Sequence, residues 1–236
     1  MTDIALTWAQ RAQSELGAAA RFKLLAEELA DHGASTNIVN LALRAMEDEN
    51  RHVIMCSDVD KDMGHKTGFA EFAVSEKIFN KAWAGKVSSK DELLCEMTLM
   101  CCITETFNSS LMNTIYATAE DNPAKKVIHE ILKDEIKHGQ LGWAYLADES
   151  QKRDITFLSQ YLEPMLDMAV KDELFAPVID NNPDSINQGV LPESLRLDQF
   201  KDTLEQVVIP GFEHFGLETG GVKSWLAKKV AGSLSE

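Results

Sequence analysis

Two short stretches of this chain share one pattern: Asp48-Glu49-Asn50-Arg51-His52 and Asp134-Glu135-Ile136-Lys137-His138. Both read Asp-Glu-x-x-His, and both lie inside long segments of helical periodicity. Residues three apart on an α-helix share one face, so the Glu and the His of each copy point the same way. Two such motifs on facing helices, with one Glu from each of two further helices, form a dinuclear metal site in some four-helix bundles. The question is whether the chain supplies two more carboxylates at the same depth.

Hydrophobic periodicity, turn residues and caps predict four long helices. They are expected over residues 4–31, from a cap at Ser35 or Thr36 to about Cys56, over 89–119 and over 123–147. The connection 57–88 between the second and third helices is long, with a polar loop at 58–64 and a short helix within 70–83. A long crossover of this kind brings the third helix back to the same end of a bundle.

Depth selects two glutamates as the remaining ligands. A helix rises about 1.5 Å per residue, so antiparallel neighbours match in depth when they are equally far from their shared turn. By this criterion Glu15 in the first helix matches the first motif, and Glu105 in the third helix matches the second. Glu28 lies too close to its turn, and Glu96 lies too far from its own. Glu15 and Glu105 are also the only charges in the apolar stripes of their helices.

The predicted site therefore holds four carboxylates and two imidazoles: Glu15, Glu49, His52, Glu105, Glu135 and His138. Oxygen donors with one nitrogen per ion suit iron or manganese. Burying four carboxylates without countercharge costs many kcal/mol, and two divalent cations cancel the four negative charges. Asp48 and Asp134 are expected to accept the outer ring N–H of a ligating histidine, on their own or the facing helix, with an ordinary solvated position as the alternative.

Three further residues, Thr98, Cys102 and Ser109, lie one to two turns from Glu105. They are candidates for the wall of a substrate pocket, and simple helix packing is the alternative. The four cysteines form no CxxC pair and are expected to be reduced thiols.

The composition argues against nucleic acid and membranes as partners. The net charge of −15 disfavours nucleic acid, whose phosphates are bound by Lys and Arg. The first ten residues have neither the basic start nor the apolar run of a signal peptide, and no stretch approaches ~20 apolar residues. We therefore expect a cytoplasmic protein without a membrane segment.

The pattern changes after Asp148. Helices are expected over 154–175, over 196–216 with a kink or break at Pro210-Gly211, and over 221–231, with a loop at 178–195. No linker separates them from the preceding helices. We therefore expect one domain over 1–236, with a metal-binding bundle at 4–147 and appended helices at 148–236.

The ligand pattern resembles that of the ferritin-like di-iron carboxylate superfamily, over about residues 4–147. The match rests on Glu15, Glu49-x-x-His52, Glu105 and Glu135-x-x-His138. The resemblance implies an all-α, ferritin-like four-helix bundle that holds two iron ions, with Fe/Mn or Mn/Mn pairs as alternatives. It also implies that Glu49 and Glu135 bridge the ions and that Glu15 and Glu105 are terminal ligands.

Within that superfamily the appended helices favour the oxygenase or oxidase branch, because they can close a substrate pocket. The resemblance then implies an enzyme that activates dioxygen to oxidise or hydroxylate a small organic substrate and that receives electrons from a reductase or ferredoxin. It is compatible with a homodimer. The alternative is a protein that stores, oxidises or senses iron, or that removes peroxide. A cavity for an organic molecule beside the metals would favour the oxygenase.

Overall fold

The computed structural model describes residues 3–64, 83–169 and 183–233. Within these ranges the regular elements are all helical and no β-strand occurs. The prediction of an all-α chain is thus confirmed for this part of the chain. None of its helices is both long enough and apolar enough to cross a membrane.

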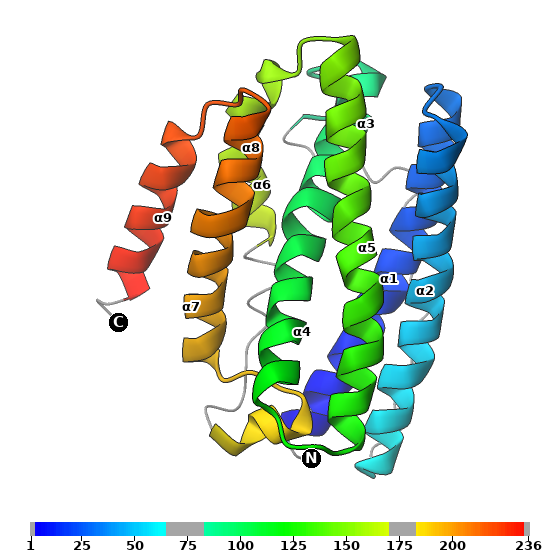
Figure 1. The fold of residues 1–236 in the computed structure, drawn as a ribbon, viewed down its shortest axis with the longest axis vertical. Helices are drawn as coiled ribbons and strands as arrows, with labels where there is room; N and C mark the ends of the chain where they lie inside the picture. The colour runs from blue at the N-terminus through cyan, green and yellow to red at the C-terminus, as the bar shows by residue number, and fades with distance from the viewer. Residues whose placement is uncertain (1–2, 65–82, 170–182, 234–236) are drawn as a thin grey trace.

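Four long helical segments run side by side (Figure 1). Three of them are α1 (Asp3–Asp31), α2 (Thr36–Asp62) and α5 (Pro123–Lys152). The other consists of three consecutive elements, α3 (Ser89–Met97), η1 (Thr98–Glu105) and α4 (Thr106–Thr118). α1 packs against α2, η1 and α4 pack against α5, and α2 packs against α5. The two motif-bearing helices are therefore neighbours.

Two tight turns set the register of the antiparallel pairs. Gly33 follows α1 with a φ of +72°, a left-handed conformation that glycine adopts at little cost. Ser35 then caps α2 by accepting a hydrogen bond from the amide of Ile38 at 3.4 Å. Asn122 caps α5 in the same way, accepting from the amide of Lys125 at 2.9 Å. Residues equally far from each turn consequently lie at the same depth.

α2 is longer than the sequence indicated. It continues to Asp62, so most of the polar loop expected at 58–64 is helical. An ion pair between Lys61 and Asp58, 3.0 Å apart and three residues apart on the helix surface, supports this last turn. The short helix expected within 70–83 lies outside the described residues, apart from Trp83.

The third segment is helical over the expected range but is not one α-helix. Its middle part, η1, is wound as a π-helix. The hydroxyl of Thr98 donates to the carbonyl of Leu94 at 2.7 Å where η1 begins, and that of Ser109 donates to the carbonyl of Glu105 at 2.8 Å where it ends. Hydroxyls that bond back to a carbonyl four residues earlier satisfy acceptors and bend helices, which fits a change of winding at both places.

A glycine on α5 allows close contact with η1. A Cβ placed on Gly142 would lie 2.5 Å from the Cβ of Cys101 and 2.8 Å from the backbone nitrogen of Cys102. Real Cβ atoms do not approach other atoms so closely, so any side chain at this position would push the two helices apart.

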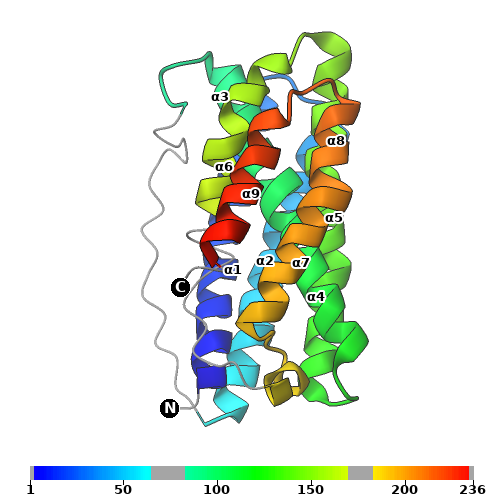
Figure 2. The same cartoon turned by 90° about the vertical axis from the view of Figure 1, so that its left-hand side faces the viewer.

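The chain after α5 covers the outer side of η1 and α4 (Figure 2). Its described elements are η2 (Thr156–Tyr161), α6 (Leu162–Ala169), η4 (Pro183–Gln188), α7 (Glu193–Thr203), η5 (Leu204–Val208), α8 (Ile209–His214) and α9 (Gly220–Ser233). α6 packs against η1 and α9, α7 packs against α4, and η4 packs against α4 and α5. This part of the chain thus forms a second layer on one side of the four long segments.

Several boundaries in this layer correct the sequence-based expectations. α5 continues to Lys152, beyond the expected end at 147, and the helix expected over 154–175 begins as the 3-10 turn η2. The expected loop at 178–195 contains η4 and the start of α7. Pro210 does not break its helix. The π-turn η5 lies directly before α8 and accommodates a residue that lacks the amide hydrogen of a regular helix.

Two buried apolar clusters occupy the space between the long segments. On α1 one cluster holds Trp8 and Ala12 and the other holds Phe22 and Leu29. Glu15 lies between them. The motif residues of α2 and α5 are likewise flanked by members of one cluster on each side. The core is therefore divided by a layer of polar side chains.

Candidate metal centre

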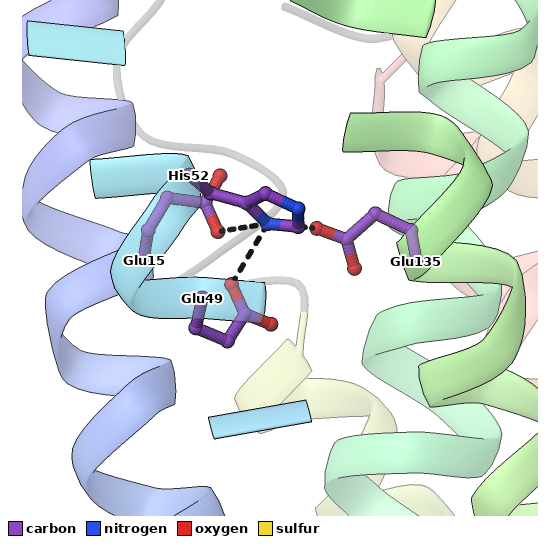
Figure 3. Close-up of side chains that lie close together, drawn as sticks. All are labelled: Glu15, Glu49, His52 and Glu135. Carbon is purple, nitrogen blue, oxygen red and sulfur yellow. Dashed lines mark hydrogen bonds and ion pairs between the residues drawn. The ribbon is translucent and has the colours of Figure 1, made fainter. Parts of the chain in front are cut away.

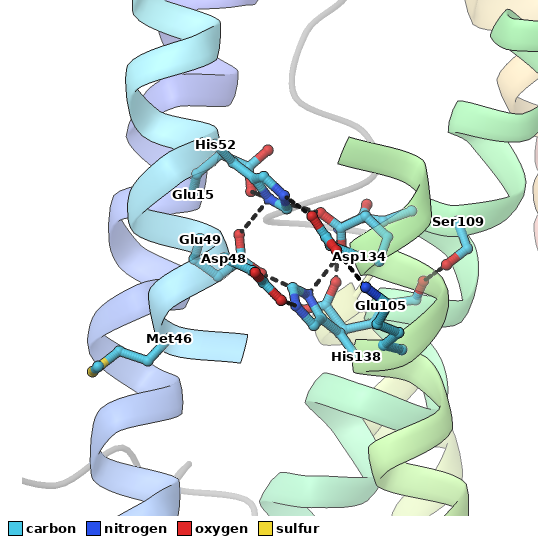
Figure 4. Close-up of polar contacts among 12 residues, drawn as sticks. Glu15, Met46, Asp48, Glu49, His52, Glu105, Ser109, Asp134 and His138 are labelled. Atoms are coloured by element: carbon cyan, nitrogen blue, oxygen red, sulfur yellow. Dashed lines mark hydrogen bonds and ion pairs between the residues drawn. The ribbon is translucent and has the colours of Figure 1, made fainter. Parts of the chain in front are cut away.

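The polar layer brings together all six residues of the predicted ligand set (Figure 3, Figure 4). They form two groups, within each of which the potential ligand atoms lie within 4.8 Å of one another: Glu15, Glu49, His52 and Glu135, and Glu49, Glu105, Glu135 and His138. Glu49 and Glu135 belong to both groups. The arrangement is therefore that of two adjacent sites which share two carboxylates.

Each long segment contributes to the centre. Glu15 comes from α1, the last residue of η1 supplies Glu105, and α2 and α5 each supply a glutamate and a histidine. The six side chains are buried, and Glu49 is 1% exposed. Carboxylates at such depth require a countercharge or a proton, because burying an unpaired charge costs far more than a hydrogen bond returns. The buried Glu and His groups could hold a metal ion.

The Nδ1 atoms of both histidines face the carboxylates. His52 Nδ1 lies 3.2 Å from Glu49 Oε2, 3.6 Å from Glu135 Oε1 and 3.9 Å from Glu15 Oε2 (Figure 3). His138 Nδ1 lies 3.0 Å from Glu49 Oε1 and 3.4 Å from Glu135 Oε2. Nδ1 is therefore the nitrogen that each histidine offers to an ion.

The outer nitrogen of each histidine lies close to the aspartate of the opposite motif. His52 Nε2 lies 3.4 Å from Asp134 Oδ2 on α5, and His138 Nε2 lies 3.5 Å from Asp48 Oδ2 on α2. Of the two options left open by the sequence, the facing helix is the one observed. A carboxylate at this position holds the proton on Nε2 and leaves Nδ1 bare for a metal.

Arg51 joins the two aspartates. Its Nη2 lies 2.8 Å from Asp48 Oδ1 and also contacts Asp134, which in turn pairs with Lys137 at 2.8 Å. The cations are half or more exposed, so each pair taken alone contributes little to stability. Together they fix the orientation of both carboxylates behind the histidines.

Burial and mutual repulsion shift the pKa values within the centre. Burial, reinforced by the charge of Glu15, raises the pKa of Glu49 to about 8. Burial and the charge of Glu49 also raise the pKa of Glu135. Hydrogen bonds to Glu15 and Glu49 outweigh burial and raise the pKa of His52 to about 11. Without an ion, protons thus neutralise the cluster, and these are the protons that a metal would displace.

The pKa values of two other carboxyl groups near the centre are lowered. Against the effect of burial, hydrogen bonds with His52 and Glu49 lower the pKa of Glu15. Hydrogen bonds with His138 and Arg51 likewise overcome burial and lower the pKa of Asp48 to about 2. Asp48 is therefore an anion at neutral pH, as a partner of an imidazole N–H must be.

Three buried atoms of the centre support a metal fit directly. His138 Nδ1 lies 3.0 Å from Glu49 Oε1 and 3.4 Å from Glu135 Oε2, but none of these three atoms makes a hydrogen bond of regular geometry among the described residues, and neither does His138 Nε2. Buried polar atoms without hydrogen bonds are rare in folded proteins, and all three atoms belong to the group of Glu49, Glu105, Glu135 and His138. Four carboxylates with one imidazole per group suit iron or manganese, and the four cysteines are buried and free elsewhere.

The two glutamates rejected on depth have other partners. Glu96 is 1% exposed, accepts a hydrogen bond from Trp83 Nε1 at 3.0 Å and lies 3.6 Å from Arg21. Glu28 lies 3.6 Å from His32. Neither belongs to the metal-site groups found among the described residues. Distance from the turn therefore separated the ligands from other acidic residues.

No protein-family model matches this chain, and no curated protein matches it. The chemistry of the centre must therefore be inferred from its own residues and surroundings.

A cavity of about 460 Å³ adjoins the centre and reaches Glu15, Glu49 and Glu105. None of the three pocket candidates, Thr98, Cys102 and Ser109, lines it. The winding of η1 accounts for the positions of Thr98 and Cys102. A π-turn holds more residues than an α-turn, so residues three or seven apart are rotated further from a common face. The hydroxyls of Thr98 and Ser109 also donate to backbone carbonyls.

The residues that do line the cavity near Glu105 are Thr104 and Asn108. The Thr104 hydroxyl is buried and has no hydrogen-bond partner among the described residues. Asn108 Nδ2 donates to Glu105 Oε2 at 3.4 Å. Asn108 could have been found from its spacing of three residues to Glu105. Thr104 could not, because neighbours in a regular helix point in different directions.

Proposed function

We propose that this chain is a ferritin-like four-helix-bundle protein that binds two iron ions and activates dioxygen to oxidise a small organic substrate. The two residue groups that share Glu49 and Glu135 support the dinuclear part of the proposal. Manganese in one or both positions remains compatible with the same donors. Two bound ferrous ions would supply the electrons and the Lewis acidity for the reduction of dioxygen.

The protein residues have separate roles in this proposal. Glu15 and His52 hold one ion, Glu105 and His138 hold the other, and the shared glutamates lie between them. Asp134 and Asp48 keep a proton on the outer nitrogens of the histidines. Because the layer is buried between two apolar clusters, bulk water has little access to the ions from either end of the bundle.

The cavity beside the centre is the observation that favours substrate oxidation over iron storage. Its volume of about 460 Å³ lies in the range of ~300–1,000 Å³ that is typical of small-molecule sites. It reaches carboxylates of both groups, so a molecule in it would lie against the ions. Storage or detoxification of iron needs a path for ions but no space for an organic molecule.

Anaerobic reconstitution with Fe(II), followed by metal analysis, tests the centre. We expect about two iron ions per chain, since two ligand groups are present. Glu49→Ala removes a ligand of both groups and should leave less than one ion. Glu47→Ala, an exposed glutamate on the same helix, is the matched control and should keep both. Substoichiometric iron in the unchanged protein would overturn the proposal.

Exposure of the loaded protein to dioxygen tests the reaction class. An oxidase or oxygenase should consume about one dioxygen per pair of ions in a single turnover and keep its iron count unchanged. Accumulation of many ferric ions per chain would instead support the iron-handling alternative.

A further inference from the structure

The cavity beside the centre has two unlike walls. α1 supplies mostly polar residues, and the opposite wall, formed by η1, α4 and the segment after η4, is mostly apolar. The apolar residues are Met100, Leu111, Met112, Ile115, Val190 and Leu191. A substrate that fills this space must therefore combine an apolar body with a polar end.

The cations on the cavity wall are all arginines. Arg11 and Arg21 come from α1, and Arg196 comes from α7. This is an unusual concentration in a chain with a net charge of −15. Four ligand carboxylates and two divalent ions sum to zero, and Glu96 lies 3.6 Å from Arg21. In the metal-loaded protein Arg11 would consequently contribute a positive potential to the cavity.

Arg11 is held in place by groups that do not neutralise it. Its Nη2 donates to the carbonyl of Gly189 at 3.1 Å, and its guanidinium carbon lies 4.4 Å from the centre of the Trp8 ring. Its Nη1 is buried and has no hydrogen-bond partner among the described residues. A carbonyl and an aromatic face orient the guanidinium and leave donors for an anion.

The position of Arg11 gives the substrate a direction. Helical side chains lean toward the helix N-terminus, and Arg11 accordingly contacts Trp8, one turn before it. Glu15 lies one turn after it, about 6 Å further along the axis. The guanidinium therefore lies on the N-terminal side of Glu15, displaced along the cavity from the metal ligands. An anion bound there would leave the other end of the molecule at the centre.

We propose that the cavity binds an organic carboxylate, with its carboxylate group on Arg11 and its apolar body against α4, so that the opposite end faces the dinuclear centre. Arg11 is a binding and specificity residue in this proposal. The proposal rests on the proposed function for the role of the ions, but the binding step can be measured without turnover.

Isothermal titration calorimetry with two matched probe pairs tests it: octanoate with octanamide, and benzoate with benzamide. Each pair differs in charge and hardly in shape. The titrations use the full chain loaded anaerobically with Fe(II), and they are repeated on the metal-free protein. We expect the carboxylate of at least one pair to bind about tenfold or more tightly than its amide, since a charged hydrogen bond contributes roughly 1.5–3 kcal/mol.

Variants assign the preference to Arg11. Arg11→Met keeps the length and the apolar stem of the side chain, and it should abolish the preference while leaving amide binding unchanged. Arg44→Met, an exposed arginine on α2 that does not line the cavity, should keep the preference. Circular dichroism and iron content of each variant exclude misfolding as the cause.

The outcomes separate the two proposals. Loss of the preference in Arg11→Met with full iron content supports the carboxylate site. Equal binding of acid and amide in both pairs, or a preference that survives Arg11→Met, overturns it even if two ions bind. Carboxylate binding on Arg11 in a protein that takes up no metal would overturn the proposed function and leave the carboxylate site standing.

Discussion

The two halves of the centre carry the same sequence pattern on differently wound helices. Glu15 lies in the middle of α1, which is α-helical over 29 residues. Glu105 is the last residue of the π-helical segment η1. Both halves nevertheless present one glutamate at the depth of a Glu-x-x-His pair. Two helices of different winding can thus place a glutamate at the same depth. The two halves differ in what packs around each glutamate.

The π-helical segment η1 packs closely against the facing helix because that helix has a glycine at the contact. Opposite η1, α5 has Gly142, where a Cβ would collide with Cys101 and with backbone. α1 has no such requirement, since a Cβ on Gly17 would meet no atom within 4 Å. The second half therefore depends on close backbone packing, and the first half does not.

Removing the unshared ligands has the largest expected effect and tests whether the halves are equivalent as metal sites. Glu15→Ala and Glu105→Ala should each lower the iron content from about two ions to about one, because each leaves the other group intact. Metal analysis after anaerobic reconstitution measures this. Loss of both ions in only one variant would show that one half is needed to form the other.

Removing the aspartates tests the crossed pairing of the two halves. Asp48 faces His138, so Asp48→Asn should weaken the single ion that remains in Glu15→Ala by about 10–100-fold. The same change should have little effect in Glu105→Ala, whose remaining ion is held by His52. Asp134→Asn should behave in the opposite way. Competition with a metal chelator gives the affinities, and equal effects in both backgrounds would contradict the crossed arrangement.

Adding a methyl group tests the packing difference. Gly142→Ala should destabilise the metal-free protein by about 1–3 kcal/mol, because backbone atoms of η1 must move. Gly17→Ala should instead stabilise it by about 0.5–1 kcal/mol, the usual gain in an open helical position. Urea unfolding followed by circular dichroism measures both. A neutral Gly142→Ala would mean that η1 adapts without strain.

Acidification should weaken metal binding in both halves. His52 has a pKa raised to about 11, and Glu49 has one raised to about 8, so both carry protons at pH 7 without metal. Each ion must displace at least the proton of its histidine, so its affinity should fall about tenfold per pH unit below pH 8. Calorimetry in buffers of different ionisation enthalpy counts the released protons. Metal uptake without proton release would contradict this.

The same histidine gives the metal-free protein an opposite pH dependence. The folded-state pKa of His52 is raised above the ordinary value of 6.5. Its contribution to stability is therefore fully present below pH 6.5 and is lost as the pH rises toward 11. Urea unfolding at pH 6 and pH 9 should show the decline, and His52→Gln should reduce it without abolishing it, because the pKa values of His138 and Glu49 are also raised.

The sequence by itself determined which six residues form the buried Glu and His layer and how deep they lie. Glu15 and Glu105 interrupt apolar stripes at a measurable distance from turns marked by Gly33 and Asn122. Rise per residue is a property of one helix, so distance along a helix can be counted from the chain alone. The cap of the second helix could be narrowed to Ser35 or Thr36 from local hydrogen bonding alone.

Only the tertiary structure decided which aspartate serves which histidine, where the chain is wound as a π-helix and which residues line the cavity. These features depend on how each helix is rotated about its axis and on what faces it, as Gly142 faces η1. Thr98 and Cys102 were misplaced because the expected face assumed a regular α-helix. Periodicity records which side of a helix is buried, but the contacts made there are set by residues far apart in the chain.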